Sequence, residues 1–174
     1  HFQDNPTINL PSNSGLVSVF DAATGFPAAL MVDNGYLSRI RDSVSGALAV
    51  KYLANQQIEN VTIIGVDSQA YVQLKTLIAT KDIGLVKVWG PSPLDADNYA
   101  RRLVEDHDIN IEIASSVQEA VQHADLIITT TAHPNALIEA AWLKPGVHIT
   151  AVGNHRPGAP KVHPHVFQRV DLIV

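Results

Sequence analysis

Short apolar runs alternate with amphipathic stretches along most of the chain, and this alternation restricts the fold more than any other feature. From residue 35 onward the runs are rich in β-branched residues and almost continuously apolar, as in parallel strands that are covered on both faces. We expect strands at residues 61–65, 85–89, 109–113, 125–129, 147–152 and 171–174. We expect helices between them at residues 68–80, 94–106, 116–123 and 135–142. This order predicts an α/β protein with a doubly wound, six-stranded parallel sheet of the Rossmann type.

The chain before residue 36 has a different pattern. Residues 15–20 and 28–32 alternate around Thr24-Gly25-Phe26-Pro27, which predicts a β-hairpin with a turn of about four residues. Residues 36–54 have apolar side chains at helical spacing, so we expect a helix that leads from the hairpin to the sheet. Residues 1–54 are therefore assigned to part of a second lobe, and residues 55–174 to a dinucleotide-binding domain.

The composition narrows the kind of partner. The chain has 174 residues, 46% of them hydrophobic, and its net charge of -5 provides no basic surface for nucleic acid or anionic membranes. It has no cysteine, which excludes disulfides, thiolate metal sites and a cysteine nucleophile. No apolar run reaches the roughly 18 residues of a membrane span. We expect a cytoplasmic protein with a small soluble ligand, and a fragment of a longer chain, since the sequence starts without methionine and stops in an apolar run.

The turn after residues 61–65 is the candidate cofactor site. It reads Gly65-Val-Asp67-Ser68-Gln69-Ala70, a tight turn and a helix start, where backbone N–H groups can face a pyrophosphate. Only the first glycine of the usual motif is present, and the carboxylate of Asp67 in the place of the second should repel phosphates. We predict that Gly65, Asp67, Ser68 and Gln69 contact a dinucleotide. The alternative is an ordinary tight turn.

Other strand ends supply further candidates, because open α/β sheets bind ligands at the carboxyl ends of their strands. The second predicted strand is followed by Ser92, without the acid that binds ribose hydroxyls or the arginine that accepts a 2′-phosphate. Ser92 is either a cofactor ligand or ordinary loop chemistry. The candidates after the fourth and fifth strands are Thr129, Thr130, Thr131, Val152, Gly153 and Asn154. The threonines also suit a strand for their β-branched shape alone. The missing arginine favours NAD as cofactor, and NADP stays open.

Several blocks in a consistent order over almost the whole chain resemble the ornithine cyclodeaminase/mu-crystallin family. They are Asp21-Ala-Ala-Thr-Gly25-Phe-Pro27, Leu37-Ser-Arg-Ile-Arg41, the Gly65 turn, Asp125-Leu-Ile-Ile-Thr-Thr-Thr131 and Leu143-Lys-Pro-Gly146-Val-His-Ile-Thr-Ala-Val-Gly153. Asn5-Pro6 and Leu30-Met-Val-Asp33 are most similar to the ectoine-utilisation, cyclodeaminase-like branch. The resemblance implies a homodimeric, NAD(P)-dependent enzyme. Its substrate is a small amino or imino acid, which undergoes deaminating cyclisation or imine reduction by hydride transfer.

The resemblance also implies roles for single residues. Arg41 matches the arginine that binds the substrate carboxylate, a task that suits a guanidinium fork. Alternatively it is a surface residue that pairs with Asp42 or Asp33. His155 has the place of the acid that accepts a proton in cyclodeaminases, and Lys161 that of a usual glutamate. A histidine can do general acid–base work, or it is a solvated loop residue. A further family lysine should precede residue 1.

These departures leave more than one function open. The substitutions at Asp67, Asp42, His155 and Lys161 permit a catalytically degenerate family member that binds a dinucleotide or small ligand without turnover. A purely structural dimerisation domain is a third possibility. The group His155, His163 and His165 lies among prolines without a recognisable ligand spacing, so we expect no metal site.

Overall fold

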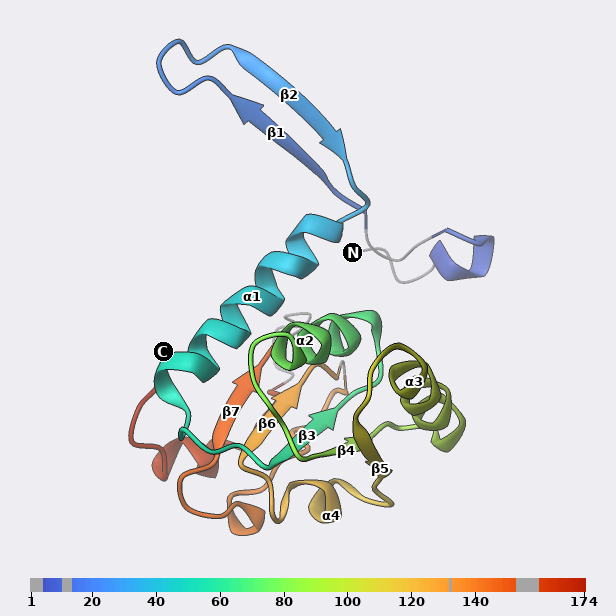
Figure 1. Ribbon diagram of the computed structural model, residues 1–174, viewed down its shortest axis with the longest axis vertical. Coiled ribbons are helices and arrows are strands. Elements are labelled where there is room, and N and C mark those ends of the chain that lie inside the picture. Colours follow the sequence, from blue (N-terminus) through green and yellow to red (C-terminus); the bar gives the residue numbers. More distant parts are fainter. Residues whose placement is uncertain (1–4, 11–13, 132, 153–159) are drawn as a thin grey trace. The chain divides into compact units, whose positions relative to one another are not determined.

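The computed structural model describes residues 5–10, 14–131, 133–152 and 160–174. The chain divides into two compact units, His1–Asp42 and Ser43–Val174 (Figure 1). The first unit contains a hairpin, and the second contains a sheet covered by helices. Within the described ranges, no helix is long and apolar enough to cross a membrane.

An antiparallel hairpin forms most of the first unit. Its elements are the 3-10 helix η1 (Asn5–Ile8) and the paired strands β1 (Leu16–Phe20) and β2 (Pro27–Val32). The turn comprises residues 21–26, so the expected turn of about four residues is wrong, and Pro27 already belongs to β2. The cause is the Asp21 carboxylate, which accepts hydrogen bonds from the backbone N–H groups of Ala23 at 3.1 Å and Thr24 at 2.7 Å. These bonds organise the chain from residue 21 onward.

The predicted helix at residues 36–54 is confirmed as α1 (Tyr36–Leu53). Asp33 organises its start, because its carboxylate accepts hydrogen bonds from the backbone N–H groups of Gly35 at 3.1 Å and Leu37 at 2.6 Å. Such bonds satisfy amides that have no partner inside the helix. α1 continues from the first unit into the second.

A parallel sheet of five strands forms the centre of the second unit (Figure 1). Its strands are β3 (Asn60–Ile64), β4 (Leu85–Trp89), β5 (Asn110–Ile113), β6 (Leu126–Thr129) and β7 (His148–Ala151). The order β5-β4-β3-β6-β7 places the first of these strands at the centre, and the chain then extends the sheet to both sides of it. This is the doubly wound Rossmann arrangement, and five of the six predicted strands are confirmed.

Helices cover both faces of the sheet, because successive side chains of a strand point to opposite faces. On one face α2 (Ser68–Ile78) and α3 (Pro93–Asp106) pack on a buried cluster that includes Ile63, Leu74 and Leu103. On the other, the short α4 (Val117–Val121) packs on a cluster that includes Ile64. The three N-caps are Asp67, Ser92 and Ser116, and each side chain accepts a hydrogen bond from the backbone N–H three residues on.

One predicted helix and one predicted strand do not form. Residues 135–142 form no α-helix, and only the 3-10 helix η2 (Ala140–Trp142) lies there. Ile138 is fully buried and pairs in an extended bridge with Val162, so tertiary pairing outweighs the helical pattern. Residues 171–174 form no strand, and Val174 is 97% exposed. In the described part of the chain nothing covers this segment, so no burial offsets the entropy of ordering it. The sheet therefore has five strands and not six.

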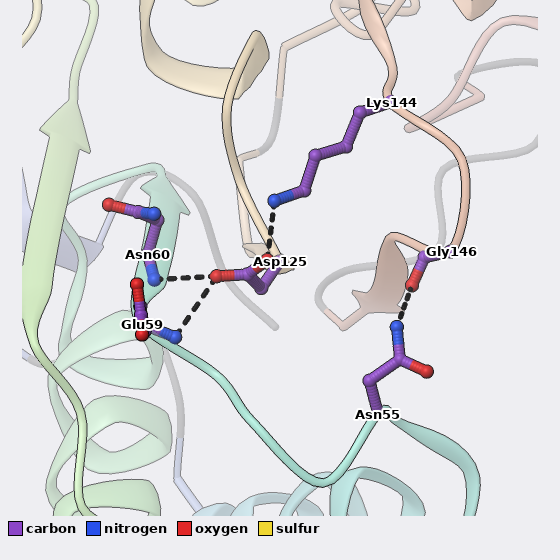
Figure 2. A network of polar contacts seen from close by, with 6 residues as sticks. All are labelled: Asn55, Glu59, Asn60, Asp125, Lys144 and Gly146. Atoms are coloured by element: carbon purple, nitrogen blue, oxygen red, sulfur yellow. Dashed lines mark hydrogen bonds and ion pairs between the residues drawn. The ribbon is translucent and has the colours of Figure 1, made fainter.

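A polar network joins the amino ends of β3 and β6 to the loop before β7 (Figure 2). The Asp125 carboxylate accepts hydrogen bonds from the backbone N–H groups of Glu59 at 3.0 Å and Asn60 at 2.8 Å, and it pairs with Lys144. The Asn55 side chain donates to the Gly146 carbonyl at 3.1 Å. Because β7 begins directly after this loop, the network ties the start of β7 to the amino ends of β3 and β6.

Replacing Asp125 should weaken the fold in a pH-dependent way. Burial raises the pKa of Asp125, but hydrogen bonds from Lys144, Asn60 and Glu59 lower it, and the pKa lies below its ordinary value of 3.8. A lowered pKa stabilises the fold above the ordinary value, and this stability is lost as the pH falls through the folded-state pKa. We expect Asp125→Asn to reduce the free energy of unfolding by about 1–2 kcal/mol at pH 7.

Urea unfolding at pH 7 and at about pH 3 measures this effect, and the difference between Asp125→Asn and wild type should shrink at the acidic pH. The matched control is Asp82→Asn, an exposed aspartate of the same unit, which should change stability by less than about 0.5 kcal/mol. Equal stability of Asp125→Asn and wild type at pH 7 would show that the network is not stabilising.

Candidate functional site

Gly65 follows β3 directly and lies against the residues that follow β6. Its φ is +112°, and a Cβ there would lie 2.7 Å from Thr130 Oγ1 and 2.9 Å from the Thr131 nitrogen. Its N–H donates to the Trp89 carbonyl at 2.9 Å. Both the backbone conformation and the contact with β6 therefore require glycine. The chain leaves β3 toward β4 on one side, with β6 on the other, so this is the switch point where open α/β sheets bind ligands.

Asp67 has a structural role that the sequence did not reveal. It is the N-cap of α2, and its Oδ1 accepts hydrogen bonds from the Ala70 N–H at 2.8 Å and from Thr130 Oγ1 at 3.0 Å. A carboxylate suits this position because the amino end of a helix carries partial positive charge. The negative charge thus lies where the motif would place a phosphate.

A cavity of about 500 Å³ opens beside this turn, between α2 and α3. Four predicted site residues line it: Gly65, Asp67, Ser68 and Thr131. The turn after β3, the end of β6 and the first turns of two helices thus meet at one place. The volume lies within the usual range for small-molecule sites.

One face of α3 completes the cavity with residues that the sequence analysis missed. They are Asp95, Asn98, Tyr99 and Arg102. Their spacing of three and four residues places them on one side of a helix, and this periodicity was the available signal. The hydrophobic pattern drew attention instead to the residues that hold α3 on the sheet.

Tyr99 is a buried polar group at the wall of the cavity. Only 6% of it is exposed, and among the described residues its hydroxyl has no hydrogen-bond partner. Burial raises its pKa, and the negative charge of Asp67 adds to the shift, so the hydroxyl stays protonated. An unpaired buried hydroxyl is uncommon and is explained where a ligand completes it. The Arg102 guanidinium lies 4.1 Å from the ring centre of Tyr71 in the same cavity.

The other predicted cofactor ligands differ in burial and in their hydrogen-bond partners. Ser92 caps α3 and accepts a hydrogen bond from the Asp95 N–H at 3.3 Å. Gln69 is half-buried in the first turn of α2. Thr129 is fully buried, and its hydroxyl has no partner among the residues that the structure describes. Val152 donates its N–H to the Thr129 carbonyl at 2.8 Å and so continues the ladder beyond β7.

The remaining predicted site residues either do not line this cavity or lie outside the described part of the chain. Arg41 lies in the first unit, and its guanidinium pairs with Asp42 at 2.7 Å. Gly153, Asn154 and His155 lie outside the described residues. Lys161 donates a hydrogen bond to the Thr131 carbonyl and thereby brings a positive charge to the end of β6. Over the described ranges no three histidine or acidic side chains form a cluster that could hold a metal ion.

The fold and this crevice define a Rossmann-type α/β protein, and comparison with known proteins identifies the family. The sequence model of the ornithine cyclodeaminase/mu-crystallin family matches residues 1–174. The chain therefore belongs to this family, as its sequence motifs predicted.

Curated relatives cover a range of related activities. The chain is 34% identical over 173 residues to an uncharacterized cyclodeaminase of Sinorhizobium fredii. The aligned region covers 99% of this chain and 52% of that protein. It is 31% identical over 170 residues to the ketimine reductase mu-crystallin of Macropus fuliginosus, 98% of this chain and 52% of that protein. The chain thus spans about half the length of the curated relatives it matches.

Solved structures share the same architecture. The Delta(1)-pyrroline-2-carboxylate reductase of Thermococcus litoralis, solved in complex with NADH and L-proline, has a TM-score of 0.88 and 27% identity. This likeness covers 96% of the chain and 51% of the reductase. An archaeal alanine dehydrogenase dimer with bound NAD has a TM-score of 0.77 and 31% identity, over 84% of this chain and 45% of that one.

Adding a methyl group at Gly65 should destabilise the switch point strongly. Gly65→Ala forces a Cβ against Thr130 and the Thr131 backbone and strains the positive φ, so we expect a loss of about 3 kcal/mol or more in urea unfolding. Gly146→Ala is the matched control, since its φ is +79° but its Cβ would meet only the Asn55 side chain. Its cost should be about 1 kcal/mol. Equal losses in the two variants would contradict the role of the close approach.

Proposed function

We propose that this chain carries the cofactor site of an NAD-dependent enzyme that reduces a small cyclic imino acid by hydride transfer. The observation that supports this most is the cavity at the switch point, where the Gly65 turn, Thr131 and one face of α3 converge. Family relatives that are ketimine and pyrroline-carboxylate reductases, one solved with NADH, agree with it. Deaminating cyclisation is the second reaction of the same site, since cyclodeaminases belong to the same family.

Imine reduction is placed first because of one substitution. The family resemblance implies that His155 takes the place of the acid that accepts a proton in cyclodeaminases, so ornithine cyclisation would lack that acid here. Reduction of an imine needs fewer protein groups, namely a site that binds the substrate carboxylate and a proton for the nitrogen. Arg41 is our candidate for the carboxylate, and His155 for proton transfer.

The residues around the cavity favour NAD over NADP. Asp95 lines the cavity from the first turn of α3, where a carboxylate can accept hydrogen bonds from ribose hydroxyls and would repel a 2′-phosphate. In the sequence, residues 90–100 after the strand end at Trp89 include no arginine. Arg102 is held over the ring of Tyr71.

The chain's own residues would orient the reaction, while bound NADH would supply the hydride that goes to the imine carbon. Tyr99 offers a buried, protonated hydroxyl to a polar group of the cofactor. Thr131 lines the cavity, and its carbonyl is held by Lys161. The Lys161 ammonium places positive charge near the end of β6, where an anionic substrate group would be attracted.

The hairpin supports a homodimer. Leu16, Phe20, Phe26, Leu30 and Val32 are each more than half exposed, and apolar surface of this kind is stabilised when a partner covers it. We assign this surface to a second copy of the chain. We also place the protein in the cytoplasm and, from the sequence branch that it resembles, in ectoine utilisation. A monomer in light scattering at micromolar concentration would contradict the dimer.

Binding and turnover test the proposal. Titration calorimetry of the full chain should show NADH binding more tightly than NADPH, and Delta(1)-pyrroline-2-carboxylate should consume NADH in equal molar amounts. Arg41→Lys keeps the charge but loses the fork, so its KM for the imino acid should rise about tenfold or more with little change in NADH affinity. Arg101→Lys on α3, an exposed arginine paired with Asp97, is the matched control and should behave as wild type.

The outcomes separate the alternatives. NADH binding without turnover of small cyclic imines or diamino acids would favour the degenerate binding protein that the substitutions at Asp67, Asp42, His155 and Lys161 permit. Absence of both NADH and NADPH binding would contradict the cofactor proposal and leave a structural role.

A further inference from the structure

The Asp67 carboxylate occupies the amino end of α2, where the pyrophosphate of a dinucleotide would be expected to bind. Its carboxylate accepts a hydrogen bond from the Ala70 N–H, one of the first-turn amides of α2. In a dinucleotide turn such amides face the pyrophosphate. The protein thus already holds an anion at this helix terminus, and the anion belongs to its own chain.

The same carboxylate crosses the switch point. Thr130 is 99% buried, its N–H donates to the Ile64 carbonyl at 3.0 Å, and its hydroxyl donates to Asp67 Oδ1 at 3.0 Å. Thr130 is therefore held rigidly at the end of β6. Its bond to Asp67 joins the turn after β3 to the end of β6 at the switch point, where open α/β sheets bind ligands.

We propose that Asp67 is an internal substitute for the pyrophosphate, which stabilises the turn before the dinucleotide binds and thereby sets the dinucleotide affinity. The inference rests on the proposed function. Binding requires the pyrophosphate either to displace the carboxylate from the Ala70 N–H and Thr130 or to lie beside a like charge. In both cases the affinity is lower than a neutral residue at this position would allow.

The described side chains that line the cavity do not cancel this charge. Besides Asp67, the charged residues among them are Asp95 and Arg102, which are of opposite sign. Asp67 therefore leaves the group with an excess of negative charge. Removing it should both favour a pyrophosphate and take away a favourable charge from the helix terminus. Stability and affinity are thus expected to change in opposite directions, which a merely structural cap would not produce.

Asp67→Asn is the sharpest variant, because the amide oxygen can still accept from Ala70 and Thr130 and asparagine remains a good N-cap. Asp67→Ser is a second variant that keeps the cap and shortens the side chain. Asp97→Asn is the matched control. Asp97 is an exposed aspartate of α3 that pairs with Arg101, so its substitution removes the same charge away from the turn. Each is titrated with NADH at low and at high salt, and its thermal unfolding is measured without ligand.

We expect Asp67→Asn and Asp67→Ser to bind NADH about tenfold more tightly than wild type at low salt. The gain should shrink at high salt, because salt screens the repulsion in the wild type. Both variants should unfold at a slightly lower temperature, and Asp97→Asn should bind as wild type does.

Unchanged or weaker NADH binding in both Asp67 variants, with measurable binding in wild type, would overturn this inference and leave the proposed function standing. If neither wild type nor either variant binds NADH or NADPH, the inference and the cofactor proposal fail together. A gain in Asp97→Asn equal to that in Asp67→Asn would overturn the inference as well, since net charge alone would then explain the effect.

Discussion

The close approach of β3 and β6 at Gly65 governs the geometry of this protein. Gly65 has no Cβ, so the turn after β3 lies directly against Thr130 and Thr131, and the N–H of Thr130 continues the ladder to the Ile64 carbonyl. This contact places the start of α2 over the end of β6. The cavity, the cap of α2 and the bond between Asp67 and Thr130 all follow from that placement. At the opposite edge, the Asp125 network keeps the amino ends of the same strands in register with the loop before β7.

Much of the fold could be predicted from sequence because its local and tertiary signals agree. The central strands β3 and β6 are largely apolar and buried on both faces, and the helix starts carry capping side chains such as Ser116. Residues 135–142 show the limit of this approach. Their helical periodicity is real, but Ile138 is buried in an extended bridge with Val162, a partner distant in sequence. Residues 171–174 are equally apolar, yet in the described residues nothing buries them.

The candidate site could be predicted in part for a similar reason. A glycine after a central strand marks the switch point, so Gly65, Asp67, Ser68 and Thr131 could be located by their place along the chain. The contribution of α3 depends on how that helix turns about its axis, which side-chain packing decides. The capping role of Asp67 also depends on Thr130, which is distant in sequence. From the sequence alone, Asp67 is expected only to repel phosphate. In the structure, the same side chain caps α2 and stabilises the turn.

The proposed function requires that a dinucleotide binds at the switch point above Gly65. Backbone amide NMR of the chain titrated with NADH tests this residue by residue. We predict that the largest shifts fall on the amides from Gly65 to Ala70 and on Thr130 and Thr131. Glu59 and Asn60, at the opposite edge of the sheet, should change little. Saturating NADH that leaves the Gly65 turn unshifted, or that shifts mainly the opposite edge, would contradict it.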